Sequence, residues 1–194
     1  MRALVVYCHP NPESLSAATL GRVIIGLSAA DHEARVTDLY ADGFDPTLSC
    51  DERRNHKVPG VTADLQRYAD DLAWAEALVL VYPTWWSGQP AMLKGWIDRV
   101  WVAGVAWELP PGANVLRPQL TNIRKIVVVT THGSAKHINA LEGEAGKRTV
   151  TRSMRAMCSK RVRTTWCALY GVDRSTEARR IAFLDRVERL MSKL

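Results

Sequence analysis

Short apolar segments that alternate with amphipathic ones constrain the fold of this chain more than any other feature. The apolar segments are Ala3–Cys8, Glu33–Leu39, Ala77–Tyr82, Lys125–Thr131 and Val162–Leu169. Each has the length of a buried strand, and repeated strand–helix alternation is typical of a parallel sheet covered by helices on both faces. Five strands joined by right-handed crossovers predict an α/β, doubly wound parallel sheet in the order 2-1-3-4-5.

The segments between the strands place apolar residues at helical spacing, which predicts one buried stripe per helix. Three stripes follow the spacing i, i+3, i+4 and i+7: Leu20-Val23-Ile24-Leu27, Leu65-Tyr68-Ala69-Leu72 and Leu93-Trp96-Ile97-Val100. A last helix, capped by Ser175, is expected to bury Ile181, Leu184, Val187 and Met191. A less regular helix is expected over about Lys147–Cys158.

The size of the chain and its cysteines narrow the class of protein. A length of 194 residues suits a single domain over 1–194, and no run approaches the ~20 apolar residues that span a bilayer. The apolar start ends at His9-Pro10 with no cleavage site, so we expect a first strand, no signal peptide and a cytoplasmic protein. The four cysteines form no C-x-x-C pair, which favours free structural thiols and predicts no metal site.

Basic residues are unevenly distributed in a chain of net charge +6. No acidic residue lies between Glu144 and Asp173, whereas seven Lys and Arg residues fall within 147–163. This stretch is interpreted either as a solvated helix face or as a site that attracts phosphate or another anionic partner. Nucleic-acid binding is the least favoured reading, because no known motif accompanies the charge.

Ligands of an open parallel sheet bind beyond the carboxyl ends of its strands, which here are three loops. The first loop, His9–Ser16, places hydroxyls and free N–H groups at a helix start, which suits either phosphate binding or simple capping. The second contains Trp85 and Trp86; adjacent side chains of an extended segment point to opposite sides, so one should face a cleft or an interface. The third, Thr130–Ser134, lets the backbone approach a ligand closely.

Taken together, the loops describe an anion pocket, an aromatic wall and a close backbone wall. A phosphorylated planar heterocycle fits this combination, and a flavin nucleotide fits it best. Neither the dinucleotide-binding G-x-G-x-x-G sequence nor a P-loop is present.

Specific motifs in these same loops resemble the NAD(P)H:quinone oxidoreductase family. They are His9-Pro10 with Ser14, Tyr82-Pro83-x-Trp85-Trp86, Thr130-Thr131-x-Gly133-Ser134, and the helix start Pro90-Ala91-Met92-Leu93-Lys94-Gly95-Trp96-Ile97-Asp98-Arg99-Val100. The resemblance implies a flavodoxin-like fold, a bound flavin (FAD or FMN), NAD(P)H as electron donor, and a homodimer. It also implies ping-pong hydride transfer through flavin N5 to a quinone-like acceptor.

The resemblance further implies which residues hold the cofactor. His9, Ser14, Leu15 and Ser16 correspond to the phosphate site, and Pro83, Thr84, Trp85, Trp86 and Ser87 to the border of the isoalloxazine. Thr130, His132 and Gly133 correspond to its far side, and Arg179 to an arginine that FAD-binding members present to the cofactor.

The chain departs from the family beyond its third loop. Mammalian-type members carry a tyrosine and a histidine there, whereas this chain reads Ser134-Ala135-Lys136-His137-Ile138. His132, Lys136 and His137 are candidates for that role or ordinary polar loop residues, and the Trp86 N–H is a candidate to stabilise charge on the reduced ring.

A different class of function stays open beside this one. The chain is either such an enzyme or a flavin- or nucleotide-binding redox carrier or regulatory subunit, attached peripherally to a membrane transporter. A hydrolase on the same scaffold is disfavoured, because no G-x-S-x-G sequence occurs.

Overall fold

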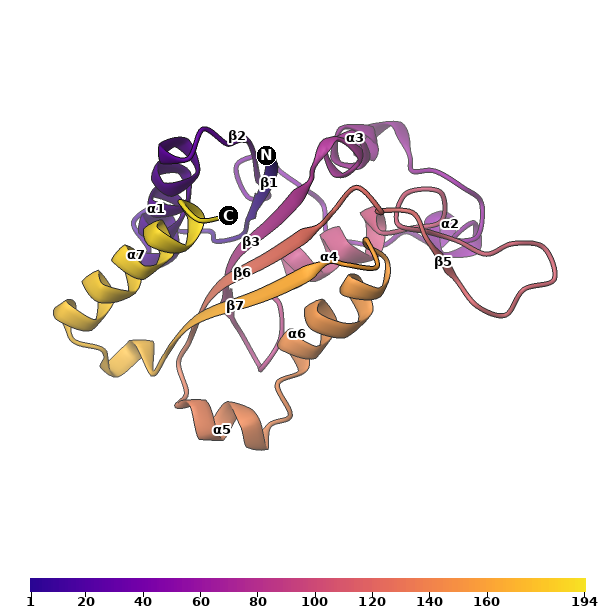
Figure 1. Cartoon of the computed structure of the whole chain (residues 1–194). Helices are drawn as coiled ribbons and strands as arrows, with labels where there is room; N and C mark the ends of the chain where they lie inside the picture. The colour runs from indigo at the N-terminus through magenta and orange to yellow at the C-terminus, as the bar shows by residue number, and fades with distance from the viewer.

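A five-stranded parallel sheet forms the centre of the protein in the computed structural model, which describes every residue from Met1 to Leu194 (Figure 1). Its strands lie in the order β2-β1-β3-β6-β7. Their bounds are β1 Arg2–Tyr7, β2 Glu33–Asp38, β3 Ala77–Thr84, β6 Lys125–His132 and β7 Arg163–Tyr170. Counted along the chain this is the order 2-1-3-4-5, so the predicted doubly wound sheet is confirmed.

Helices cover both faces of this sheet (Figure 1). On one face lie α1 (Leu15–Ala29) and α7 (Glu177–Met191); on the other lie α3 (Gln66–Trp74), α4 (Ala91–Val100) and α6 (Ala145–Arg148), which continues into the π-helical segment η2 (Thr149–Met154). The helix α5 (Lys136–Leu141) lies beyond the end of β6. The shorter elements are α2 (Cys50–Arg54), η1 (Ala63–Leu65), η3 (Val172–Arg174) and the antiparallel pair β4 (Trp107–Glu108) and β5 (Arg117–Pro118).

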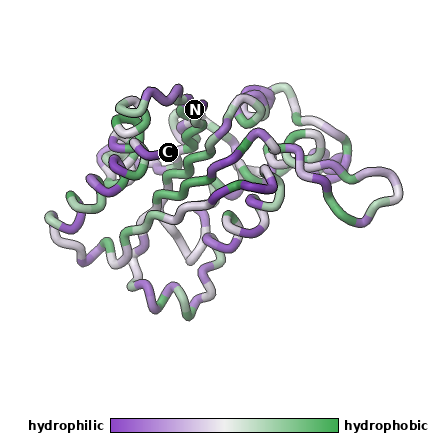
Figure 2. Tube along the Cα trace, in the orientation of Figure 1, coloured by the Kyte–Doolittle hydropathy of each residue, from purple (hydrophilic) through white to green (hydrophobic).

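Side chains alternate along the central strands and so divide the core into two layers. In β1, Leu4 and Val6 pack with the α3–α4–η2 layer, whereas Ala3 and Val5 pack with the α1–α7 layer. The strands accordingly read as nearly continuous apolar runs, which Figure 2 shows as green segments through the middle of the molecule.

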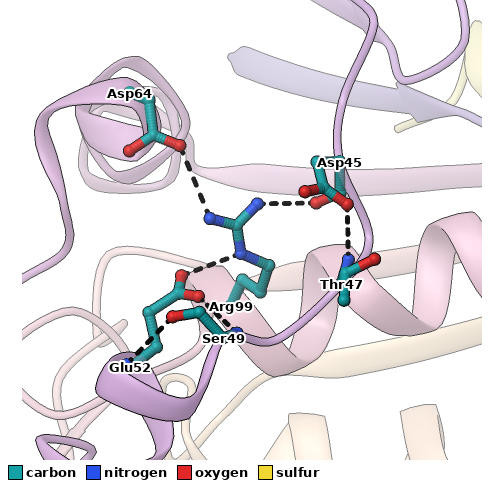
Figure 3. A network of polar contacts seen from close by, with 6 residues as sticks. All are labelled: Asp45, Thr47, Ser49, Glu52, Asp64 and Arg99. Carbon is teal, nitrogen blue, oxygen red and sulfur yellow. Dashed lines mark hydrogen bonds and ion pairs between the residues drawn. The ribbon is translucent and has the colours of Figure 1, made fainter.

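An ion-pair network around Arg99 ties α4 to the segment that follows β2 (Figure 3). Arg99 is 9% exposed; its Nε donates to Glu52 Oε1 at 2.8 Å, and its two terminal nitrogens reach the Asp45 carbonyl at 2.6 Å and Asp64 Oδ2 at 3.5 Å. Ser49 completes a capping box with Glu52 at the start of α2. This network orders a stretch, 40–60, for which the sequence shows no periodicity.

Three expectations for the helices are corrected by the structure. Ile181 is 48% exposed and Leu184 is only partly buried, whereas α7 buries Val187 and Met191 as expected, together with Phe183. The N-cap of α7 is Thr176, whose hydroxyl accepts from the Arg179 N–H, rather than Ser175. The irregular helix expected over about Lys147–Cys158 begins earlier, at Ala145, and is π-helical in its second part.

All four cysteines are free thiols, as expected. Burial raises the pKa of Cys8 and of Cys158 to about 12, so both stay protonated and inert at neutral pH. No helix has the length and apolar character that crossing a membrane requires.

Candidate functional site

A cleft of about 980 Å³ opens at the carboxyl ends of β3, β6 and β7, the edge of the sheet where a ligand was expected. The turn after β3, the loop after β6, α5 and the start of η3 enclose it. Its lining residues are Pro83, Thr84, Trp85, Trp86, Ser87, Thr131, His132, Gly133, Ser134, Asn139, Glu142, Val172 and Asp173. The volume lies at the upper end of the range for cofactor and small-molecule sites.

The tryptophan wall of the cleft is carried on a tight two-residue turn. Trp85 pairs with Gly88 in an antiparallel bridge, and the backbone between them is left-handed at both Trp86 (φ 49°) and Ser87 (φ 57°). Trp85 is 42% exposed and Trp86 fully exposed. The sequence predicts that one of the two indoles faces a cleft or an interface; both residues line the cleft, because the strand ends at Thr84.

Contacts from α6 hold this turn in place. The Gly146 N–H donates to the Ser87 carbonyl at 2.8 Å, and the Gln89 side chain donates to the Gly146 carbonyl at 2.8 Å. A Cβ at position 146 would lie 3.0 Å from Gly88 Cα, so the approach depends on glycine. The Ser87 hydroxyl also donates to Glu142, the C-cap of α5. The turn is thus braced from two sides despite its exposure.

His132 ends β6 and is buried in the wall of the cleft. Its Nδ1 lies 2.7 Å from Asn139 Oδ1, its Nε2 lies 3.4 Å from the Thr84 hydroxyl, and its ring stacks on Tyr170 at 4.5 Å between centroids. Burial lowers the pKa of His132 below 6.5, against the opposing effect of the Asn139 hydrogen bond. The imidazole is therefore neutral at physiological pH.

The first loop reaches the same edge of the sheet through α1. Ser14 is the N-cap of α1 and accepts from the Ala17 N–H at 3.1 Å. The N–H groups of Leu15 and Ser16 lie in the first turn, where no intrahelical acceptor exists. His9 lies beside Trp85, with ring centroids 6.2 Å apart. Helix start and tryptophan wall are thereby neighbours, which is the arrangement that a phosphorylated ring needs.

The structure separates the predicted site residues into two groups. Seven line the cleft: Pro83, Thr84, Trp85, Trp86, Ser87, His132 and Gly133. The other predicted residues do not line it. Thr130 lies next to it and forms a 2.9 Å hydrogen bond with Thr84. Ser14, Leu15 and Ser16 form the neighbouring helix start, and His9 lies in the loop before it. His137 is exposed on α5. Arg179 is exposed on α7 and donates to the carbonyl of Tyr170, the residue stacked on His132.

Sequence reasoning missed the contribution of α5 and η3. Asn139, Glu142 and Asp173 line the cleft, yet they lie in or directly after elements of six and three residues that are too short to show periodicity. Asp173 approaches so closely that a Cβ at Gly133 would lie 2.8 Å from its Oδ2. Only the three-dimensional arrangement identifies these residues.

Comparison with known proteins agrees with this geometry. Residues 1–189 match the family described as flavodoxin-like fold. Among curated proteins, the chain is 36% identical to an NAD(P)H oxidoreductase of Haemophilus influenzae over 120 residues, covering 59% of this chain and 57% of that protein. It is 30% identical to human ribosyldihydronicotinamide dehydrogenase (quinone) over 154 residues, covering 70% and 65%. The alignments thus span less than two thirds of these relatives.

Solved structures resemble the whole chain. Smu.1420 from Streptococcus mutans superposes with a TM-score of 0.88 at 30% identity, covering all of both chains. An NAD(P)H:quinone oxidoreductase from Methanothermobacter marburgensis gives a TM-score of 0.81 at 28% identity, covering 100% of this chain and 95% of that one. The chain belongs to the flavodoxin-like fold family. Within it, the relatives confirm the resemblance to NAD(P)H:quinone oxidoreductases.

Proposed function

We propose that this protein binds a flavin, FAD or FMN, in the cleft and transfers reducing equivalents from NAD(P)H to a quinone-like acceptor. The observation that carries the proposal is the cleft itself: two exposed indoles line an opening at the carboxyl ends of β3, β6 and β7, and the free N–H groups of a helix start lie at the neighbouring β1. The residues present fit a flavin, because they supply a flat aromatic wall, an anion site and a close backbone wall. When bound, the flavin supplies the redox chemistry.

The chain's own residues have separate tasks in this proposal. The N–H groups of Leu15 and Ser16 hold the phosphate, and the indoles of Trp85 and Trp86 border the ring and exclude water from it. The N–H groups of Trp86 and Ser87, which have no acceptor in the backbone, stabilise negative charge on the ring side facing them. Because donor and acceptor share one cleft, each excludes the other, and the kinetics are ping-pong.

The test is spectroscopic. The purified protein is incubated with FAD or with FMN, separated from free flavin, and recorded between 300 and 550 nm before and after anaerobic NADPH. Flavin bands that bleach, followed by recovery on adding a benzoquinone, are expected. Retained bands that do not bleach would favour a carrier or regulatory subunit, and failure to retain either flavin would refute the proposal.

We also propose that two copies associate through the face that carries α4. A groove of about 550 Å³ beside α4 has five carboxylates and one arginine, Arg99, in its lining; the carboxylates are Asp45, Asp51, Glu52, Asp64 and Asp98, of which Asp51 and Asp98 also pair with Arg54 and Lys94. On the other side of α4, the exposed side chains of Arg148, Arg152 and Arg155 form no ion pair. A two-fold axis through α4 brings each basic side onto the partner's acidic side.

A charge reversal tests this association. Arg152→Glu with Arg155→Glu is expected to convert a dimer into a monomer in analytical ultracentrifugation, and adding Asp51→Lys with Asp64→Lys is expected to restore it. Reversal of Arg174 and Arg189, which are exposed on η3 and α7, serves as the control. A wild-type monomer, or a dimer indifferent to the first pair, would refute the arrangement.

A further inference from the structure

The orientation of the Asn139 amide is fixed by groups that accept hydrogen bonds and cannot donate them. Its Nδ2 donates to the Ala135 carbonyl at 2.9 Å and to the Ser134 carbonyl at 3.3 Å. A flipped amide would turn its oxygen onto two carbonyl oxygens, which repel it. Oδ1 therefore faces His132.

That orientation determines which ring nitrogen of His132 carries the proton. An amide oxygen only accepts, so the 2.7 Å contact requires a proton on Nδ1 of His132. In a neutral imidazole the other nitrogen, Nε2, then bears a lone pair. Its one neighbour is the Thr84 hydroxyl at 3.4 Å, a distance at which a hydrogen bond is weak, and that hydroxyl lies closer to Thr130, at 2.9 Å.

The surroundings of the ring keep it neutral. His132 is buried and stacked on Tyr170. The charged groups that face it are Glu142 and Glu144, which favour protonation, and Lys147, which opposes it. Lys147 pairs with Glu144 at 2.9 Å and so offsets part of its charge at the ring, and burial is the largest effect on the pKa of His132.

We infer that Asn139 is a positioning residue that holds His132 as the Nδ1-protonated neutral tautomer, so that Nε2 accepts a hydrogen bond from an N–H or O–H group of the ligand. The ligand half of this inference rests on the proposed function, because it assumes that the cleft takes the flavin. The inference therefore restricts ligands that contact His132 to those with a hydrogen-bond donor at that position. It also separates His132 from proton supply: reduction of a quinone to a quinol takes up a proton besides a hydride, and Nε2 has none to give.

The tautomer is read directly from two-bond ¹H–¹⁵N spectra of the ligand-free protein at pH 7.5, with His132→Gln identifying the signal among the five histidines. We expect a protonated Nδ1 and an unprotonated Nε2. An Nε2-protonated ring, or an imidazolium, would overturn the inference whatever the protein's activity.

A matched pair of variants separates positioning from a merely structural role. Asn139→Leu and Asn139→Asp both remove the hydrogen bonds to Ser134 and Ala135, but only the aspartate keeps an acceptor for Nδ1–H. In the leucine variant the Nε2-protonated tautomer is expected to appear. In the aspartate variant the pKa of His132 is expected to rise, because a carboxylate stabilises the imidazolium. Identical His132 spectra in the two variants would overturn the role of Asn139.

The ligand half is tested by the dissociation constants of FMN and of FAD between pH 5 and 9. Wild-type affinity is expected to fall about tenfold as His132 is protonated below pH 6.5, the loss of one hydrogen bond, whereas His132→Gln is expected to show no such step. His56→Gln, on a partly exposed histidine after α2 that lies outside the cleft, is the control. A wild-type affinity that does not change with pH would refute Nε2 as an acceptor. Failure to bind either flavin would refute the proposed function, and the tautomer would still be tested by the NMR spectra.

Discussion

The protein contains two buried polar networks, one around Arg99 and one around His132, and they differ in how completely they are satisfied. Arg99 is permanently charged, and its partners are Glu52, the Asp45 carbonyl and Asp64. His132 is neutral, lines the cleft, and has one strong partner, while its second nitrogen has only a 3.4 Å contact with the Thr84 hydroxyl. A network that satisfies its own groups stabilises structure, whereas one that leaves an acceptor weakly engaged is suited to a ligand.

Removal of Arg99 is expected to have the largest effect on stability. Arg99→Met leaves Glu52 without its guanidinium partner in a setting where its side chain is 15% exposed, and breaking such a pair costs about 3–5 kcal/mol. Urea unfolding measures the loss. Arg54→Met, which removes an exposed pair with Asp51, is the control and is expected to cost less than about 1 kcal/mol. Equal losses of unfolding free energy in the two variants would show that the buried ion pair stabilises the protein no more than the exposed one.

The neutral network should be the weaker of the two. Asn139→Leu deprives the Ser134 and Ala135 carbonyls and His132 Nδ1 of their partner, for an expected loss of about 1–3 kcal/mol in the same assay. Ser134→Ala changes an exposed hydroxyl and is expected to stay within about 0.5 kcal/mol. A loss larger than that of Arg99→Met would reverse the order proposed for the two networks.

The two networks should also fail in different pH ranges. The pKa of His132 is lowered, so the unfolded chain takes up the proton first and stability falls as pH drops below 6.5, by at most about 1.4 kcal/mol per pH unit. Burial raises the pKa of Glu52, but hydrogen bonds from Ser49 and Arg99 outweigh it; the net pKa is lowered, and its contribution is lost as pH falls below 4.5. Urea unfolding at several pH values measures both effects. In His132→Gln the free energy of unfolding should no longer fall just below pH 6.5, and in Glu52→Gln it should fall less below pH 4.5. If either variant instead changed the pH range assigned to the other residue, the assignment of the two ranges to His132 and Glu52 would be wrong.

The smallest effect is expected from an ion pair outside both networks. Lys94 and Asp98 are one helical turn apart on α4, and their side chains are 51% and 43% exposed. Lys94→Ala should cost about 0.3–0.5 kcal/mol, and 1 M NaCl should remove most of the difference from wild type. A difference that persists in salt would mean that packing, rather than charge, carries the effect.

The strands were predictable from sequence because burial on both faces leaves little freedom in their composition. Each predicted strand agrees with the observed one to within two residues; the largest error is at β3, which continues through Pro83 and Thr84 because these pair with Thr131 and His132. The buried face of α7 was less predictable. Both Ile181 and Phe183 lie at helical spacing from Val187, so the sequence alone does not show which of the two is buried. Packing against α1, where a Cβ at Gly26 would lie 2.5 Å from the Glu188 carbonyl, decides between them.

The site was predictable where it depends on strand ends and not where it depends on short elements. Thr84, Trp85, Trp86 and His132 follow directly from the rule that ligands bind beyond parallel strands. The hydrogen bond between His132 and Asn139 does not follow from that rule. It joins residues seven positions apart through a turn that no local sequence pattern predicts. The Arg99 network was equally hidden, since its partners lie 35 to 54 residues away.

The turn at Trp86 and Ser87 has a consequence for anyone who sets out to make this protein more heat-resistant. Two side-chain-bearing residues in left-handed backbone carry a penalty of roughly 1–2 kcal/mol each, which Asn-Gly would relieve. A thermostability screen would therefore tend to select that exchange. The same exchange deletes the most exposed indole of the proposed flavin wall, so selection for melting temperature alone would drive the sequence away from catalysis at this position.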